Sequence, residues 1–167
     1  MFNGTIAGER EVLAACLARL HLGRRQVVRS LRCSGLQTPA DERMLSYIRE
    51  KLYSLCEETL ADFLAKNREQ HPVEPDLNPG GQLVCVGDED FEHIFRDREG
   101  WARFRRAFPG SDGTLRFSRV GLDRGVTQAM LYAGQQFDWN VGSGVFWLYT
   151  NLDGERIEAA RVGSWIS

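Results

Sequence analysis

The sequence lacks a strong excess of either charge, because 21 Lys and Arg residues stand against 23 Asp and Glu residues, for a net charge of −2. Proteins dedicated to nucleic acids usually carry a marked basic excess. We therefore rank a nucleic-acid partner last. The sequence also lacks an apolar run of about 18 residues, the least that a membrane-spanning helix needs. No membrane partner is expected.

Metal-binding and disulfide patterns are missing as well. The three histidines are far apart in the sequence: His21, His71 and His93. The four cysteines are also widely spaced: Cys16, Cys33, Cys56 and Cys85. None of these residues forms the His-x-x-x-His or Cys-x-x-Cys pairs that are typical of zinc sites. We interpret the cysteines as reduced, mostly buried thiols, and we predict neither a metal nor a cofactor.

Catalytic constellations are equally scarce. The carboxylate pairs Asp88/Asp90 and Glu57/Glu58 have no nucleophile beside them in the sequence. Such pairs are typical of helix starts and solvated charge. No catalytic residue is therefore predicted, and whether the protein is an enzyme stays open, with a non-enzymatic function favoured.

The length of 167 residues and the 43% of hydrophobic residues predict one globular domain over residues 1–167. The start of the chain has no basic segment followed by an apolar run, so no signal peptide is expected and the cytoplasm is the default location. An exported protein is the alternative if the sequence is a trimmed mature form.

The N-terminal part, residues 1–70, reads as helical. Residues 7–20 carry apolar side chains at helical spacing. A second, longer amphipathic helix is predicted over 38–67, with Thr38 as the N-cap and a single apolar stripe. Between them, residues 26–34 fit either a short strand or a helix. Residues 68–81, which contain prolines and a glycine pair, form a loop.

Residues 82–167 read as mixed and then β. A short strand (82–87) and two short helices (88–95 and 100–108) come first. Four strand-like runs then follow in order: 114–122, 126–137, 143–152 and 155–166. Asp153-Gly154, between the last two, is a strong signal for a hairpin turn.

These elements predict an α+β fold in which the long amphipathic helix and the shorter helices pack on a four- or five-stranded antiparallel β-meander. The strand at 143–152 is apolar on both sides, so we expect it to lie centrally with both faces covered. Either helices cover both faces, or a curved sheet closes around a pocket.

Few residues look functional. Asp138, Trp139 and Asn140 fall at the predicted turn between two strands, where an indole either folds back or serves as a contact, and tryptophan is enriched in binding hot spots. Ser143, between two glycines, fits a turn or bulge entering a strand, where the glycines supply positive φ or allow close packing. Arg119, predicted within a strand among apolar neighbours, needs a carboxylate partner or would anchor a ligand in a pocket.

Arginines cluster in two segments, 24–32 and 95–108, although the overall charge is balanced. Solvated faces explain most such runs. The alternative is a basic patch that binds an acidic partner.

The C-terminal half contains the segments "PGSDGTLRFSRVGL", "TQAMLYAGQQ", "GSGVFWLY" and a closing "WIS". Over residues 91–167 their order resembles a family of small bacterial proteins with a C-terminal F-S-R-V-G … A-x-x-Y … G-x-G … W-I-S β-meander and no established activity. The chain departs from the pattern at Leu122, where an aromatic is usual, and at Glu155-Arg156, where Lys-Trp is usual. The resemblance implies a bacterial source and exported relatives, but no reaction.

The sequence therefore predicts a small bacterial, non-enzymatic binding or interaction protein, of an accessory or immunity-like kind, whose partner is another protein. The alternative is a small-molecule-binding or minor hydrolytic protein with a pocket in a curved sheet. An interaction protein should expose Trp139 on a flat or convex surface, whereas a pocket protein should point Arg119 into a cavity. Oligomeric state is not predicted.

Overall fold

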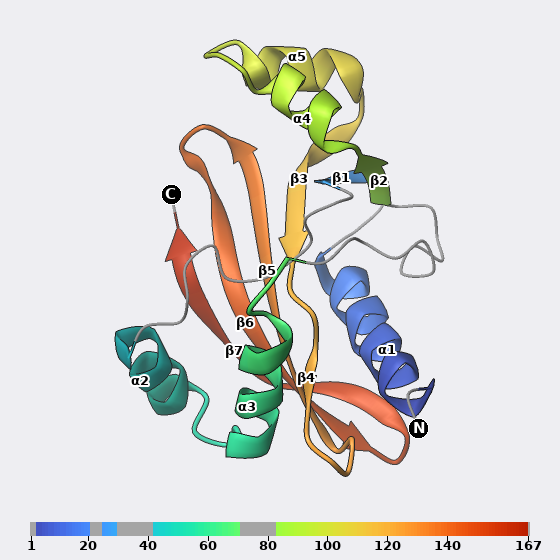
Figure 1. Ribbon diagram of the computed structural model, residues 1–167, viewed down its shortest axis with the longest axis vertical. Coiled ribbons are helices and arrows are strands. Elements are labelled where there is room, and N and C mark those ends of the chain that lie inside the picture. Colours follow the sequence, from blue (N-terminus) through green and yellow to red (C-terminus); the bar gives the residue numbers. More distant parts are fainter. Residues whose placement is uncertain (1–2, 21–24, 30–41, 71–82, 167) are drawn as a thin grey trace.

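The computed structural model describes residues 3–20, 25–29, 42–70 and 83–166 (Figure 1). The helices in these ranges are α1 (Asn3–Leu20), α2 (Glu42–Lys51), α3 (Glu57–Lys66), α4 (Asp88–Ile94) and α5 (Gly100–Ala107). The strands are β1 (Arg25–Arg29), β2 (Leu83–Val86), β3 (Ser111–Phe117), β4 (Gly121–Leu122), β5 (Gln128–Asp138), β6 (Val141–Leu152) and β7 (Glu155–Ile166).

These strands form one open sheet in the order β2-β1-β3-β5-β6-β7, with β4 paired to β5. Strands β3 to β7 pair in antiparallel fashion, which confirms the predicted α+β fold with a β-meander. Residues 26–34, for which the sequence left strand and helix open, contain most of β1. This strand pairs in parallel with both β2 and β3. The sheet is therefore extended beyond the meander by two parallel strands.

The β6–β7 turn forms where the sequence predicted it. Asp153 and Gly154 have φ angles of 51° and 87°. A two-residue hairpin loop of the type that matches strand twist needs positive φ at both positions, which glycine and aspartate tolerate. The predicted hairpin is confirmed.

Helices cover both faces of the sheet. On one face, buried residues of α1 such as Val12 pack with Trp147 and Tyr149 of β6. On the other face, residues of α2 and α3 pack with Phe146 and Leu148 of the same strand. Strand β6 is therefore central in the meander and apolar on both sides, and helical cover, the first of the two predicted arrangements, is the one observed.

The predicted long helix is wrong, because α2 ends at Lys51 and α3 begins at Glu57. Cys56 is extended, with φ −81° and ψ 146°. Its backbone N–H donates to Gln128 Oε1 of β5 at 2.7 Å, a bond that a continuous helix would have made within itself. The apolar stripe continues through the break, so its spacing gives no sign of it. Thr38, the predicted N-cap, lies outside the described residues.

The predicted strand over 114–122 is also interrupted, between β3 and β4. Ser118 still pairs with Tyr132, but its hydroxyl oxygen takes the place of a backbone carbonyl and accepts from Tyr132 N at 2.9 Å. Asn67 then holds the Arg119 backbone from both sides, accepting from its N–H at 2.9 Å and donating to its carbonyl at 3.0 Å. Arg119 therefore lies in a connection and not within a strand.

The Gly-Ser-Gly segment is not a turn. Ser143 lies within β6, paired with Gln135 and Ile166. A Cβ on Gly142 would approach the Trp165 ring at 2.8 Å, and one on Gly144 would collide with Trp165 Nε1. Trp165 Nε1 donates to the Tyr132 hydroxyl at 2.8 Å across this space. The two glycines thus serve the predicted close packing, because they make room for the indole.

Candidate functional site

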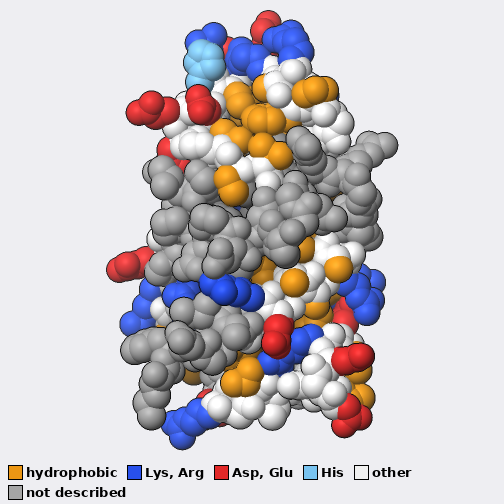
Figure 2. Space-filling view, turned by 90° about the vertical axis from the view of Figure 1, so that its right-hand side faces the viewer, with side chains coloured by type: hydrophobic (Ala, Val, Ile, Leu, Met, Phe, Trp, Pro, Cys, Tyr) orange, Lys and Arg blue, Asp and Glu red, His pale blue; other side chains and the backbone are white. Residues whose placement is uncertain are grey.

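Helices α4 and α5 form a small cap at one end of the sheet (Figure 1). The cap has its own aromatic cluster, in which Ile94, Trp101 and Phe104 are buried together with Val86 of β2. Phe91, Phe95 and Phe108 pack against it and stay partly exposed. Figure 2 shows apolar side chains gathered at this upper end of the molecule, below a rim of charged residues.

The tip of the β5–β6 hairpin lies against this cap. β5 ends at Asp138, Trp139-Asn140 form the turn, and β6 begins at Val141, so the turn is where the sequence predicted it. Trp139 is 46% exposed and Val141 is 52% exposed. We call these four residues, Asp138 to Val141, the tip surface.

The Trp139 side chain is held on one side only. Its Nε1 donates to the Arg98 carbonyl at 3.2 Å, and its ring meets Phe95 edge to face, with the centroids 6.2 Å apart. A Cβ on Gly100 would lie 3.2 Å from Trp139 Cζ2, so the indole also rests on that glycine. The ring folds back onto the cap, which is the first of the two interpretations, and nearly half of it stays in solvent. Its use as a contact stays a prediction.

Asp138 fixes the turn. Its Oδ2 accepts from Arg105 Nη2 at 2.5 Å, and its Oδ1 accepts from the backbone N–H of Trp139 at 2.8 Å. The Arg105 guanidinium, followed by the Trp139 N–H, holds the pKa of Asp138 below its usual value. The ion pair between Asp138 and Arg105 thus links the tip to α5. The Trp139 indole links it to Phe95 and Arg98, which precede α5.

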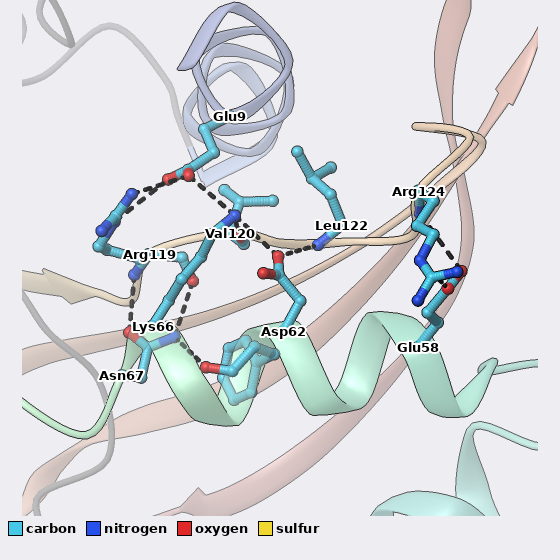
Figure 3. Close-up of polar contacts among 10 residues, drawn as sticks. Glu9, Glu58, Asp62, Lys66, Asn67, Arg119, Val120, Leu122 and Arg124 are labelled. Atoms are coloured by element: carbon cyan, nitrogen blue, oxygen red, sulfur yellow. Dashed lines mark hydrogen bonds and ion pairs between the residues drawn. The ribbon is translucent and has the colours of Figure 1, made fainter. Parts of the chain in front are cut away.

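Arg119 has no contact with the tip surface among the interactions of the described residues and belongs to a different cluster, drawn in Figure 3. Its guanidinium donates to Glu9 of α1 at 2.9 and 3.4 Å. Lys66 of α3 contacts Glu9 at 3.0 Å and Asp62 at 2.7 Å, and donates to the Val120 carbonyl at 3.1 Å. We call Glu9, Asp62, Lys66 and Arg119 the interlayer clamp, because they join α1 on one face to α3 on the other.

The interlayer clamp has two carboxylates and two cations, and each is paired within it. Glu9 and Lys66 are only 12% and 14% exposed. Arg119 therefore has the carboxylate partner that the sequence required, and its side chain is committed to holding the β3–β4 connection. Of the predicted site residues, Ser143 shares the hairpin with the tip surface, whereas Arg119 does not.

Sequence reasoning missed three residues that contact the turn: Phe95 and Arg98 at Trp139, and Arg105 at Asp138. They lie 33 to 44 positions before the turn in the sequence, so no local pattern links them to it. The sequence marks their segment as two short helices with an arginine cluster, and neither signal places it beside the turn. Of the other cluster, residues 24–32, the structure describes residues 25–29, which form β1.

The cysteines differ in exposure. Cys16 is buried, Cys56 is partly buried and Cys85 is exposed, while Cys33 lies outside the described residues. The prediction of mostly buried thiols is therefore wrong for Cys85. Burial raises the pKa of Cys16 to about 12, an effect that the nearby Tyr149 hydroxyl only partly opposes.

Alkylation should separate these thiols. At pH 8, iodoacetamide is expected to modify Cys85 in the native protein, whereas Cys16 should react only after unfolding, because a buried thiol of raised pKa provides almost no thiolate. Peptide mass spectrometry of native and unfolded samples would measure both sites. Modification of native Cys16 at the rate of Cys85 would contradict this expectation.

Among the described residues, no group of three or more His, Cys, Asp or Glu side chains is arranged to hold a metal ion. None of the helices in those ranges has the length and hydropathy to cross a membrane. Comparisons with protein-family models, curated proteins and solved structures found no match. The resemblance of residues 91–167 to a bacterial family therefore stays a prediction.

Proposed function

We propose that this chain is a small binding protein that contacts another protein through the tip surface. The observation that supports this most strongly is Trp139, whose indole is nearly half exposed yet fixed by Arg98, Phe95 and Gly100. Tryptophan and arginine dominate the energetics of protein interfaces. A side chain that is already held in place also loses little conformational entropy when a partner covers it.

The packing favours the tip surface over a pocket beneath the meander. The side chains that would line such a pocket, among them Leu131 and Trp147, are buried under α1. On the opposite face, Met130 and Leu148 are buried under α2 and α3. Arg119, which would have anchored a ligand in the alternative prediction, is bound to Glu9.

A pull-down from a lysate of the source organism would test this proposal. We expect wild-type bait to enrich a specific protein, and we expect Trp139→Ala and Val141→Glu each to lose it. Val141→Glu is included because it changes the exposed tip without removing any contact of Trp139. Tyr53→Ala is the matched control, since Tyr53 is 90% exposed between α2 and α3, away from the tip.

Thermal melts of all four baits would establish that they are folded. A protein that is captured equally by wild type and by both tip variants would contradict the proposal. The absence of any specific capture by folded wild type would contradict it as well.

A further inference from the structure

We infer that the partner presents an acidic segment to the tip surface, with an apolar side chain against Trp139 and carboxylates beside it. The inference rests on the proposed function of the tip surface and adds the chemistry of what it binds. It follows from the charges around Trp139, from their placement along α5, and from the acidic start of α4.

Along residues 96–106 and the tip surface, five arginines stand against three carboxylates. Arg103 pairs with Asp97 at 2.6 Å and with Glu99 at 3.9 Å, and Arg105 pairs with Asp138. Arg96 also contacts Asp97, at 3.6 Å. Within the described part of the chain, every carboxylate of this group has an arginine partner. The arginines left over are Arg98 and Arg106, both exposed and without an ion pair among the described residues.

Of these two arginines, Arg98 is the one whose backbone adjoins the exposed indole. Arg98 precedes α5, and its carbonyl holds Trp139 Nε1. Arg105, about two helical turns further on, reaches Asp138 at the base of the turn. Ala102 lies between them in the sequence and is small and exposed, and Arg106 follows Arg105 directly. A segment that covers Trp139 would therefore adjoin Arg98, and an extended one could continue along α5 toward Arg106.

Guanidinium groups bind carboxylates through two parallel hydrogen bonds, which gives both affinity and orientation. A neutral segment would offer Arg98 and Arg106 only carbonyl or hydroxyl oxygens and no opposite charge, a basic segment would repel them, and a buried unpaired charge is costly. An acidic segment supplies the acceptors, while the ion pair between Arg105 and Asp138 can stay in place to keep the turn fixed.

A nucleic acid would also offer anionic groups, but the cap disfavours a long polyanion. Helix α4 begins with Asp88, Glu89 and Asp90 in its first turn, and Glu92 follows. A backbone with a negative charge at every nucleotide would have to pass this acidic helix, whereas a short acidic segment of a protein needs only α5 and the tip. We therefore assign the surface to a protein partner.

Panning a phage library of random 12-residue peptides on the full chain tests the inference even while the partner is unidentified. The leading peptide would then be synthesised, and its affinity measured by fluorescence polarisation. The variants are Trp139→Ala and the double variant Arg98→Glu, Arg106→Glu. The matched control is Arg43→Glu, Arg68→Glu, which changes the net charge equally at two exposed arginines of α2 and the segment after α3.

We expect enriched peptides that carry Asp or Glu next to an apolar residue. Their affinity should fall at least tenfold with Trp139→Ala and with Arg98→Glu, Arg106→Glu, and should change less than threefold with the control. Peptides that depend on Trp139 but lack acidic residues would overturn the acidic partner and leave the proposed function standing. No enrichment that depends on Trp139 would overturn both. Tighter binding of a single-stranded oligonucleotide than of the peptide, lost in the same variants, would assign the surface to nucleic acid instead.

Discussion

Replacing Gly121 by alanine is expected to lower the free energy of unfolding by about 3 kcal/mol, the upper part of the range for overpacked cores. Gly121 in β4 is buried against α3, and a Cβ there would lie 2.6 Å from both Phe63 N and Thr59 O. Both are backbone atoms, so no side-chain rotation can relieve the contact. Helix α3 would have to move off the sheet and expose part of the core around Phe63.

Gly163→Ala in β7 is the matched control, because a Cβ at Gly163 would meet nothing within 4 Å. Its effect should stay within about 0.5 kcal/mol, as for most surface substitutions. Urea unfolding of the two variants beside wild type would measure the difference. Equal stabilities of the two variants would contradict the close contact between α3 and β4.

Replacing Glu9 by alanine is expected to destabilise the protein by about 3 kcal/mol, the low end for breaking a buried ion pair. Glu9 contacts both cations of the interlayer clamp, at 3.0 Å from Lys66 and 2.9 Å from Arg119. Its removal takes the clamp carboxylate away from Arg119 and leaves Asp62 as the one clamp carboxylate that contacts Lys66. Because the clamp joins α1 to α3, both helical layers should loosen.

The control for Glu9 is Glu50→Ala, which removes an ion pair with Lys51 on the surface of α2, where Glu50 is 69% exposed. Exposed pairs contribute at most about 1 kcal/mol, so this variant should unfold at nearly the same denaturant concentration as wild type. A Glu9→Ala protein as stable as Glu50→Ala would show that the clamp does not hold the layers together.

Local signals predicted the elements that depend on neighbouring residues. Helix α1 follows from its apolar spacing, and the β6–β7 hairpin follows from Asp153-Gly154, where the required φ angles suit the two residues. The doubly apolar pattern of β6 also predicted cover on both sheet faces. Each of these features depends on residues that are close together in the sequence.

The predictions of a continuous helix and a continuous strand fail where a side chain that is distant in the sequence hydrogen-bonds to the backbone. The backbone N–H of Cys56, where the helix is broken, donates to Gln128, 72 positions away. The backbone N–H of Arg119, where the strand is broken, donates to Asn67, 52 positions away. Neither break has a glycine or proline at the point where it occurs. Periodicity reports which face of a segment is buried, and the buried face continues through both breaks.

The sequence predicted where in the chain the candidate site lies, but not which distant residues surround it in the fold. The sequence placed Trp139 at a turn and required a carboxylate for Arg119. It could not identify Glu9, 110 positions from Arg119, or show that Phe95, Arg98 and Arg105 meet the turn. These contacts depend on how the cap sits on the sheet end, which is set by the tertiary packing of the cap.

Site-specific photo-cross-linking tests the central claim, contact with a partner protein at the tip surface, most directly. The photoreactive amino acid p-benzoylphenylalanine would replace Val141, which is 52% exposed at the tip, and in a separate variant Tyr53, which is 90% exposed elsewhere. Irradiation in a lysate of the source organism should give a discrete adduct with one other protein from position 141 and none from position 53. No adduct from position 141, or the same adduct from both positions, would contradict the account.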